Sequence, residues 1–315
     1  NERLINTTRM KLFTFKDKKL QGVSTVPFKL EKEIQDIVEN NLKELFDLQF
    51  VKSELTIKNF RLDTLGFDEE SRSFVVIEYK KDRNYSVIDQ GYTYMSLMLN
   101  NKSDFILEYN EHCEKNLKRD DVDWSQSRVI FISPHFTEFQ KHSVNFRDVP
   151  FELWEIKQYE NGYIGFTEHK TTSDESISTV STVENTMVKK VSSEVKVYSE
   201  EYHLNLSKSR PEWVKELYFN LKERIMNLGE VEIKPNGNYL SFRRKSPFVD
   251  IVFYNSGLYT ILNMKDGTLN DPNNLMKKFE GKGHWGNGDY HTTIDNNTDL
   301  DYMMFLINQS YQDKQ

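Results

Sequence analysis

A run of β-favouring residues from Phe74 to Ile77 passes directly into Glu78, Tyr79 and Lys80. A continuous apolar run of this kind is typical of a strand that is covered on both faces, in the interior of a domain. Because side chains alternate along a strand, Glu78 and Lys80 project to one side, and Ile77 and Tyr79 project to the other. The chain must therefore place two charged side chains at the end of a buried strand.

The sequence on either side of this strand predicts a hairpin and a helix. Residues 60–67 alternate enough to form a strand that carries Asp63, and the polar residues 68–73 supply a turn, so Asp63 is expected beside Glu78. Residues 86–99 place apolar side chains at helical spacing, with Gln90 and Tyr94 four positions apart on one face. Hairpin and helix together gather polar side chains around Glu78.

Two carboxylates and an ammonium at the end of a buried strand pair are costly unless something compensates or uses the charge. A divalent cation would do so, and Mg²⁺ prefers hard oxygen ligands and needs only one or two carboxylates from the protein. Such an ion acts as a Lewis acid on a phosphoryl oxygen, and a nearby lysine positions the attacking water or offsets negative charge. The chemistry that this arrangement suits is phosphodiester hydrolysis.

These residues resemble the pattern of the PD-(D/E)XK nuclease superfamily, in which an Asp and a hairpin are followed by (D/E)-x-Lys. Asp63, Glu78 and Lys80 match this pattern one for one, and Leu62 departs from it because it stands where the superfamily name has Pro. Gln90 and Tyr94 match the Q-x-x-x-Y helix motif of a branch that contains helicase-associated and repair nucleases. The resemblance covers the N-terminal half of the chain.

The resemblance implies a Mg²⁺-dependent DNA endonuclease with a restriction-endonuclease-like mixed sheet flanked by helices, and Mn²⁺ as a substitute metal. Asp63 and Glu78 would bind the metal, Lys80 would assist the attacking water, and Gln90 and Tyr94 would shape the site or hold substrate. The pathway, DNA repair or defence against foreign DNA, stays open. Because superfamily members that cut both strands often pair, a homodimer is expected by analogy.

Two other interpretations stay open. Glu78 and Lys80 could form a surface ion pair at a solvated strand end, worth roughly 0 to 1 kcal/mol. The fold could also be a catalytically inactive nucleic-acid-binding or protein-interaction module, although the intact set of Asp63, Glu78 and Lys80 speaks against lost catalysis.

Residues 27–46 predict a first helix, and many superfamily members contribute one further acid from this helix. At about 100° per residue, Glu31 lies nearer the apolar stripe of Ile34 and Val38 than Glu33 or Glu39 does. We therefore favour Glu31 as a third metal ligand. A solvated helix charge is at least as good an interpretation for any one of these glutamates.

The order of predicted elements indicates an α/β N-terminal domain over residues 1–170. Strand positions of its core are expected at Ile106, Val129, Ile130, Ile132, Leu153 and Ile156. Residues 171–199 are rich in Ser and Thr without Gly or Pro, which favours a linker or an exposed arm. A C-terminal domain is expected over residues 200–315.

The C-terminal domain has an α+β pattern with an antiparallel sheet: a helix between Pro211 and Gly229, strand-like runs separated by turns, and a last helix. It resembles a small domain of unknown function that often follows nuclease domains and is sometimes labelled a predicted transport protein. We discount this label because no apolar run is long enough to span a membrane.

Two features of this domain could bind a ligand. Arg243, Arg244 and Lys245 form a basic cluster beside Phe242, which would suit a nucleic-acid backbone with a stacked base. The glycine-rich loop with His284, Trp285, Asn287 and Asp289 would permit close approach of a ligand to the backbone. A solvated strand end and a structural turn are the somewhat better interpretations of the two.

Composition sets broad limits. A net charge of −7 does not favour nucleic-acid binding, but a local basic groove can coexist with an acidic whole. The single cysteine, Cys113, excludes an intrachain disulfide framework and fits a reducing compartment. No apolar run approaches the length of a membrane span, and no signal-peptide core is visible, so we expect a cytoplasmic protein without membrane partners.

Overall fold

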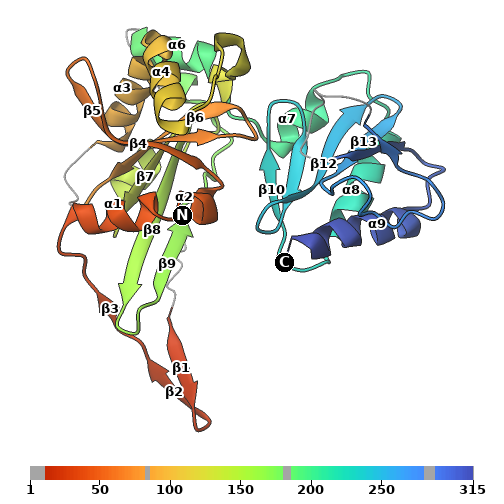
Figure 1. Ribbon diagram of the computed structural model, residues 1–315, viewed down its shortest axis with the longest axis horizontal. Coiled ribbons are helices and arrows are strands. Elements are labelled where there is room, and N and C mark those ends of the chain that lie inside the picture. The colour runs from red at the N-terminus through yellow and green to blue at the C-terminus, as the bar shows by residue number, and fades with distance from the viewer. Residues whose placement is uncertain (1–10, 82–85, 180–185, 280–287, 315) are drawn as a thin grey trace. The chain divides into compact units, whose positions relative to one another are not determined.

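The computed structural model of the chain describes residues 11–81, 86–179, 186–279 and 288–314. The chain divides into two compact units (Figure 1). Unit 1 comprises Asn1–Leu45, Gln49–Phe67 and Phe74–Val195, and unit 2 comprises Phe46–Leu48, Asp68–Ser73 and Lys196–Gln315.

Unit 1 is built on a mixed sheet of seven strands, in the order β3-β8-β7-β6-β5-β4 with β9 paired to β8. The central strands β6, β7 and β8 run parallel to one another, and the outer pairs are antiparallel. The strands are β3 (Thr25–Val26), β4 (Gln49–Ile57), β5 (Phe60–Asp68), β6 (Ser73–Tyr79), β7 (Arg128–Ser133), β8 (Phe151–Tyr159) and β9 (Ile164–Glu168). A separate hairpin, β1 (Phe13–Lys16) and β2 (Lys19–Gly22), is exposed along its length. The predicted mixed sheet is confirmed.

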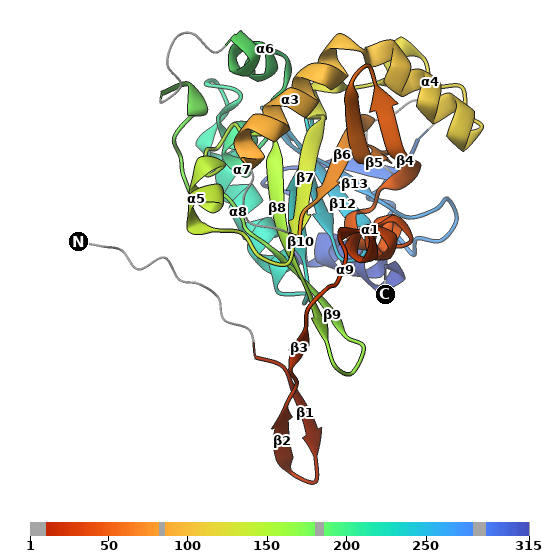
Figure 2. The same ribbon diagram turned by 90° about the vertical axis from the view of Figure 1, so that its left-hand side faces the viewer.

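Helices cover both faces of this sheet. They are α1 (Glu31–Glu39), α2 (Leu42–Phe46), α3 (Val87–Asn100), α4 (Lys102–Cys113), α5 (Glu138–Ser143) and α6 (Thr186–Glu194), with 3-10 turns at Arg119–Asp121, Trp124–Gln126 and Ile177–Thr179. Helices α3, α4 and α6 gather together (Figures 1 and 2) and bury their apolar side chains with Phe74 and Val76 of β6. Helix α1 lies against the opposite face. Tyr79 projects to that face of β6, and both Tyr79 and Glu39 of α1 contact Thr64.

Three stretches of unit 1 differ from expectation. The predicted first helix is interrupted between α1 and α2. Ile106 belongs to helix α4 rather than to a strand, because Phe105 and Tyr109, one turn apart, bury themselves in the core. Within the expected linker, α6 is a helix whose valines pack into the unit 1 core, so residues 171–199 are folded over much of their described length.

Unit 2 is an antiparallel sheet of six strands in the order β10-β11-β12-β13-β15-β14, as the α+β expectation required. The strands are β10 (Glu232–Pro235), β11 (Leu240–Arg243), β12 (Pro247–Tyr254), β13 (Gly257–Leu262), β14 (Lys277–Lys278) and β15 (Tyr290–Ile294). The helices are α7 (Glu200–Asn205), α8 (Glu212–Met226) and α9 (Leu300–Asp313), and α8 and α9 share one core with the sheet. None of the helices in the described part of the chain has the length and apolarity needed to cross a bilayer.

Candidate active site

The two predicted carboxylates meet at the open end of the β5–β6 hairpin. Asp63 lies on β5 and Glu78 near the end of β6. The backbone N–H of Tyr79 donates to Oδ2 of Asp63 over 3.0 Å, which fixes the Asp63 side chain across the strand pair. The backbone N–H of Lys80 donates to the carbonyl of Ile132 over 2.9 Å, so the chain stays paired to β7 beyond Glu78.

Glu78 is the centre of the site, and only 2% of it is exposed. Its Oε1 accepts hydrogen bonds from Nζ of Lys80 and from Nε2 of Gln90, each over 2.6 Å. Its Oε2 is buried and accepts no hydrogen bond from any described residue. A buried carboxylate oxygen without a donor is costly, so Glu78 presents an unsatisfied ligand atom.

Helix α3 supplies the two other polar side chains. It begins after Ser86, whose hydroxyl accepts from the N–H of Asp89 over 3.3 Å, a typical N-terminal cap. Gln90 and Tyr94 lie one turn apart on the helix face toward Glu78, and Nε2 of Gln90 donates to the Tyr94 hydroxyl over 2.8 Å. The structure thus brings together Asp63, Glu78, Lys80, Gln90 and Tyr94, as the spacing had indicated.

Burial and mutual repulsion set the protonation of the carboxylates. Burial, and then the charge of Asp63, raise the pKa of Glu78 from 4.5 to about 7. Burial also raises the pKa of Asp63, against the opposing effects of the Tyr79 N–H and the Lys80 charge. Burial alone would lower the pKa of Lys80, but the Glu78 carboxylate outweighs it and the pKa is raised, so Lys80 stays charged. The two carboxylates therefore hold a proton more tightly than exposed carboxylates do.

The three glutamates of the first helix have different surroundings. Oε2 of Glu31 accepts from the N–H of Lys81 over 2.9 Å, and its charge contributes to the raised pKa of Lys80. Glu33 accepts from the N–H of Lys29 over 2.9 Å at the exposed start of the helix. Glu39 accepts from Thr64 and from Gln35. Of the three, Glu31 is held against the chain that follows the Glu78 strand.

A hard divalent cation fits the oxygen donors of Asp63 and Glu78. The two carboxylates repel each other, and among the described residues Oε2 of Glu78 has no hydrogen-bond donor, so a cation could serve as its partner. The ligand atoms of Asp63, Glu78 and Glu31 do not all lie within 4.8 Å of one another. Glu31 as a third metal ligand therefore stays a prediction, supported by its bond to the Lys81 N–H and by its effect on the pKa of Lys80.

Sequence inspection missed a further carboxylate on the same side of the sheet. Glu155 of β8 lies beside Ser133 in the parallel register, at the strand ends where Lys80 also lies. Its Oε1 is 3.1 Å from Nε2 of His169 and 3.8 Å from Nζ of Lys141. Burial alone would raise the pKa of Glu155, but His169 and the Phe136 N–H outweigh it and lower the pKa to about 2. No local motif marks these contacts, because the residues are distant in sequence.

The predicted basic cluster of unit 2 has other partners. Phe242 is fully buried in the core, and Arg243 is 6% exposed with its guanidinium bonded to the carboxylates of Asp47 and Glu70, which belong to the same unit. The Arg244 guanidinium lies 4.8 Å from the ring centre of Tyr311, and Lys245 is exposed. Arg243 and Phe242 are therefore not available for a nucleic-acid backbone and a stacked base, and only Lys245 lies fully at the surface.

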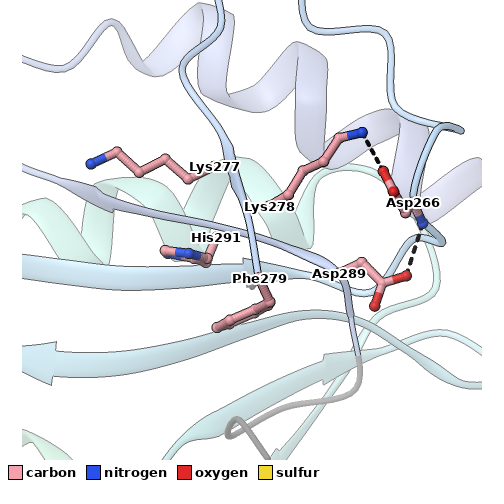
Figure 3. A pocket seen from close by; sticks show the side chains of 6 residues that line it. All are labelled: Asp266, Lys277, Lys278, Phe279, Asp289 and His291. Carbon is pink, nitrogen blue, oxygen red and sulfur yellow. Dashed lines mark hydrogen bonds and ion pairs between the residues drawn. The ribbon is translucent and has the colours of Figure 1, made fainter. Parts of the chain in front are cut away.

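A pocket of about 920 Å³ lies at the β14 edge of unit 2 (Figure 3). It is lined by Asp266, Lys277, Lys278, Phe279, Asp289 and His291. Oδ2 of Asp289 accepts from the N–H of Asp266 over 2.8 Å, and the Asp266 carboxylate pairs with Lys278. His284, Trp285 and Asn287 of the predicted ligand loop lie outside the described residues.

Comparison with known proteins places the whole chain in a family. An uncharacterized protein of Haemophilus influenzae (strain Rd) is 43% identical over 307 residues, which cover 96% of this chain and 100% of that protein. The chain belongs to the family of this protein. Residues 205–314 match a domain of unknown function, DUF5655, within the expected C-terminal domain.

Two solved structures align with part of the chain. One is a complex of EndoMS with double-stranded DNA, at 17% identity and a TM-score of 0.27 over 38% of this chain and 42% of that chain. The other is a repair endonuclease from Pyrococcus abyssi, at 18% identity and a TM-score of 0.23 over 38% of this chain and 45% of that chain. The chain thus spans less than half the length of either protein, and likenesses at this level assign no activity to it.

Proposed function

We propose that unit 1 is a metal-dependent nuclease of the PD-(D/E)XK type that hydrolyses phosphodiester bonds in DNA. The observation that carries this proposal is the pairing of Asp63 with a buried Glu78. Its Oε1 accepts from Lys80 and Gln90, and its Oε2 accepts no hydrogen bond from the described residues. A solvated surface ion pair would not bury the carboxylate or raise its pKa.

Asp63 and Glu78 would hold Mg²⁺, with Mn²⁺ as a substitute, and the ion would supply Lewis-acid polarisation of a phosphoryl oxygen. Gln90 keeps Oε1 of Glu78 turned toward Lys80, so that Oε2 faces away from both donors. Tyr94 fixes the Gln90 amide by accepting one of its N–H groups. Lys80 keeps its proton beside Glu78 and is placed to orient the attacking water and to offset the negative charge of the transition state.

The test is cleavage of labelled duplex, single-stranded, forked and RNA substrates with Mg²⁺, Mn²⁺ or chelator. Asp63→Ala and Lys80→Ala are compared with Glu33→Ala, a matched change at a half-buried first-helix carboxylate whose bond is to the Lys29 N–H. We expect metal-dependent cutting of DNA by the wild type and the Glu33 variant, and none by the other two. Since cutting both strands of a duplex favours a pair of sites, sedimentation of the wild type tests the homodimer that belongs to this proposal.

Each outcome separates the interpretations. If nothing is cut but calorimetry shows that the wild type binds Mg²⁺ and the Asp63 variant does not, the metal site stands and the substrate assignment is wrong. If the folded wild type neither cuts nor binds metal, the nuclease proposal is wrong, and the inactive binding module takes its place.

A further inference from the structure

Four rings form a continuous row across the sheet of unit 2. Tyr254 at the end of β12 is followed by Tyr259 of β13, His291 of β15 and Phe279 directly after β14. The ring centres of successive pairs are 5.6, 5.4 and 4.3 Å apart, and the interplanar angles lie between 33° and 42°. We call Tyr254, Tyr259, His291 and Phe279 the aromatic row.

The strand register places the aromatic row on the face of the sheet opposite the helices. Leu258 and Leu262 pack with α8 and α9 in the unit 2 core, so Tyr259, which alternates with them, points to the other face. Tyr254 is 48% exposed, and the other three rings are half-buried. A row that served only to fill a core would not leave its first ring half in solvent.

A cation borders the aromatic row at the sheet edge. Lys277 pairs with His291 in the β14–β15 register, so its side chain lies on the same face of the sheet as the aromatic row. Lys277 is exposed. Lys277 and Lys278 point away from each other, and Phe279 lies beside His291 (Figure 3). Lys278 pairs with Asp266, whereas Lys277 has no ion pair with a described residue. The pocket of about 920 Å³ thus has the rings of Phe279 and His291 and the Lys277 ammonium in its wall, together with Asp266, which pairs with Lys278, and Asp289.

We propose that the aromatic row and Lys277 form a binding surface for single-stranded nucleic acid in unit 2. Every base has a π-face that can stack on an aromatic side chain, and an ammonium beside the rings meets the phosphate backbone. Bases in a duplex are already stacked on one another, so a single strand should bind this row more tightly than a duplex does. The surface acts without metal and does not depend on cleavage in unit 1.

The full chain is titrated, in chelator, into a fluorescein-labelled single strand of about 12 nucleotides, a length within the range of known single-strand sites. Tyr254→Ala is expected to weaken anisotropy-measured binding by about 5- to 100-fold, as loss of one stacked base would. Tyr254→Trp keeps a ring face and should retain binding. Phe305→Ala removes a similarly exposed ring from helix α9 and should change nothing. Lys277→Gln should lower the slope of log affinity against log salt by about 0.7.

Further comparisons test which form of nucleic acid binds and whether it binds at the aromatic row. A duplex of the same sequence should bind more weakly than either single-stranded DNA or RNA, and equal or tighter binding of the duplex overturns the proposal. The proposal is also wrong if the wild type binds no single strand, or if Tyr254→Ala and Tyr259→Ala both bind as the wild type does. None of these results bears on the metal-dependent cleavage assigned to Asp63 and Glu78, which is measured separately.

Discussion

Gly91 of helix α3 lies between Gln90 and Tyr94 of the proposed active site. Replacing it with alanine would have two effects of opposite sign on the free energy of unfolding. In an exposed helix, Gly→Ala would stabilise by about 1 kcal/mol through helix propensity. Here a Cβ on Gly91 would approach three ring carbons of Phe151 at 2.6, 2.6 and 2.8 Å. Favourable carbon contacts lie at about 3.5–4.0 Å, so either the ring or the helix must move.

The Phe151 ring has little room to move. It is 6% exposed and packs edge-on against Tyr92 at 5.0 Å and against Phe131 at 6.2 Å. Overpacking of a core costs about 1–3 kcal/mol, and three contacts on a confined ring belong at the upper end. After the gain in propensity, Gly91→Ala should destabilise unit 1 by about 2 kcal/mol. A shift of α3 would also move Gln90 away from Glu78, and cleavage should fall more than stability alone explains.

The measurement is urea unfolding followed by far-UV circular dichroism, with Gly22→Ala as a control, since a Cβ at Gly22 would meet nothing within 4 Å. The control should differ from the wild type by no more than about 0.5 kcal/mol. The double variant Gly91→Ala with Phe151→Leu should recover part of the loss, because the shorter side chain vacates the space. An alanine variant at Gly91 as stable as the wild type, or more so, would refute the steric reasoning.

Three further perturbations follow from the described contacts. Asp63→Asn in chelator at pH 8 should raise the free energy of unfolding by about 1 kcal/mol, because raising the pKa of Glu78 from 4.5 to about 7 costs roughly 3 kcal/mol and burial accounts for the larger part. This penalty is absent below pH 4.5 and complete above pH 7, so thermal unfolding at pH 5 should show a smaller gain, and an equal gain would contradict the assignment. Glu155→Gln should lower the free energy of unfolding by about 1–2 kcal/mol at neutral pH. This is less than the full shift in the pKa of Glu155 implies, because its cationic partners are partly exposed. Because the pKa of Glu155 is lowered, its contribution to stability is present above pH 4.5 and lost toward pH 2. The free energies of unfolding of the wild type and the variant should therefore converge toward pH 2, and a constant difference between them would argue against an ionic origin. Gly257→Ala should destabilise unit 2 by about 3 kcal/mol or more, because φ is 141° and a Cβ would lie 2.2 Å from a backbone carbonyl. At Gly267, φ is 82° but a Cβ would enter open space, so Gly267→Ala should lower the stability measured by calorimetry by only about 1–2 kcal/mol. Equal losses for the two variants would show that backbone strain, and not the steric overlap, sets the cost at Gly257.

Local patterns were enough to predict much of the candidate site. The hairpin that brings Asp63 to Glu78 depends on alternation and on a polar turn, and both signals lie within a few residues. The α3 helix follows from apolar spacing, so Gln90 and Tyr94 could be assigned to one face. Each of these features depends on short-range geometry, which sequence periodicity reports directly.

The remainder depends on partners that lie far apart in the chain. Helix α4 has an apolar run short enough to suit a strand, and burial of Phe105 and Tyr109 decides for the helix. In α6, Val188 and Val191 contribute to the core of unit 1 in spite of a Ser- and Thr-rich composition. Arg243 looked like a solvent-facing phosphate ligand because nothing local shows that Asp47 and Glu70 bind it.

The β5–β6 hairpin also bears on the order in which the molecule forms. Closing the short loop between these strands costs little chain entropy, whereas the parallel pairs β6–β7 and β7–β8 need long crossovers. Contacts between neighbours in sequence form faster than non-local pairings. The two carboxylates should therefore be driven together before the strands that cover them are in place, and a cation bound at that stage would stabilise the hairpin relative to the unfolded chain.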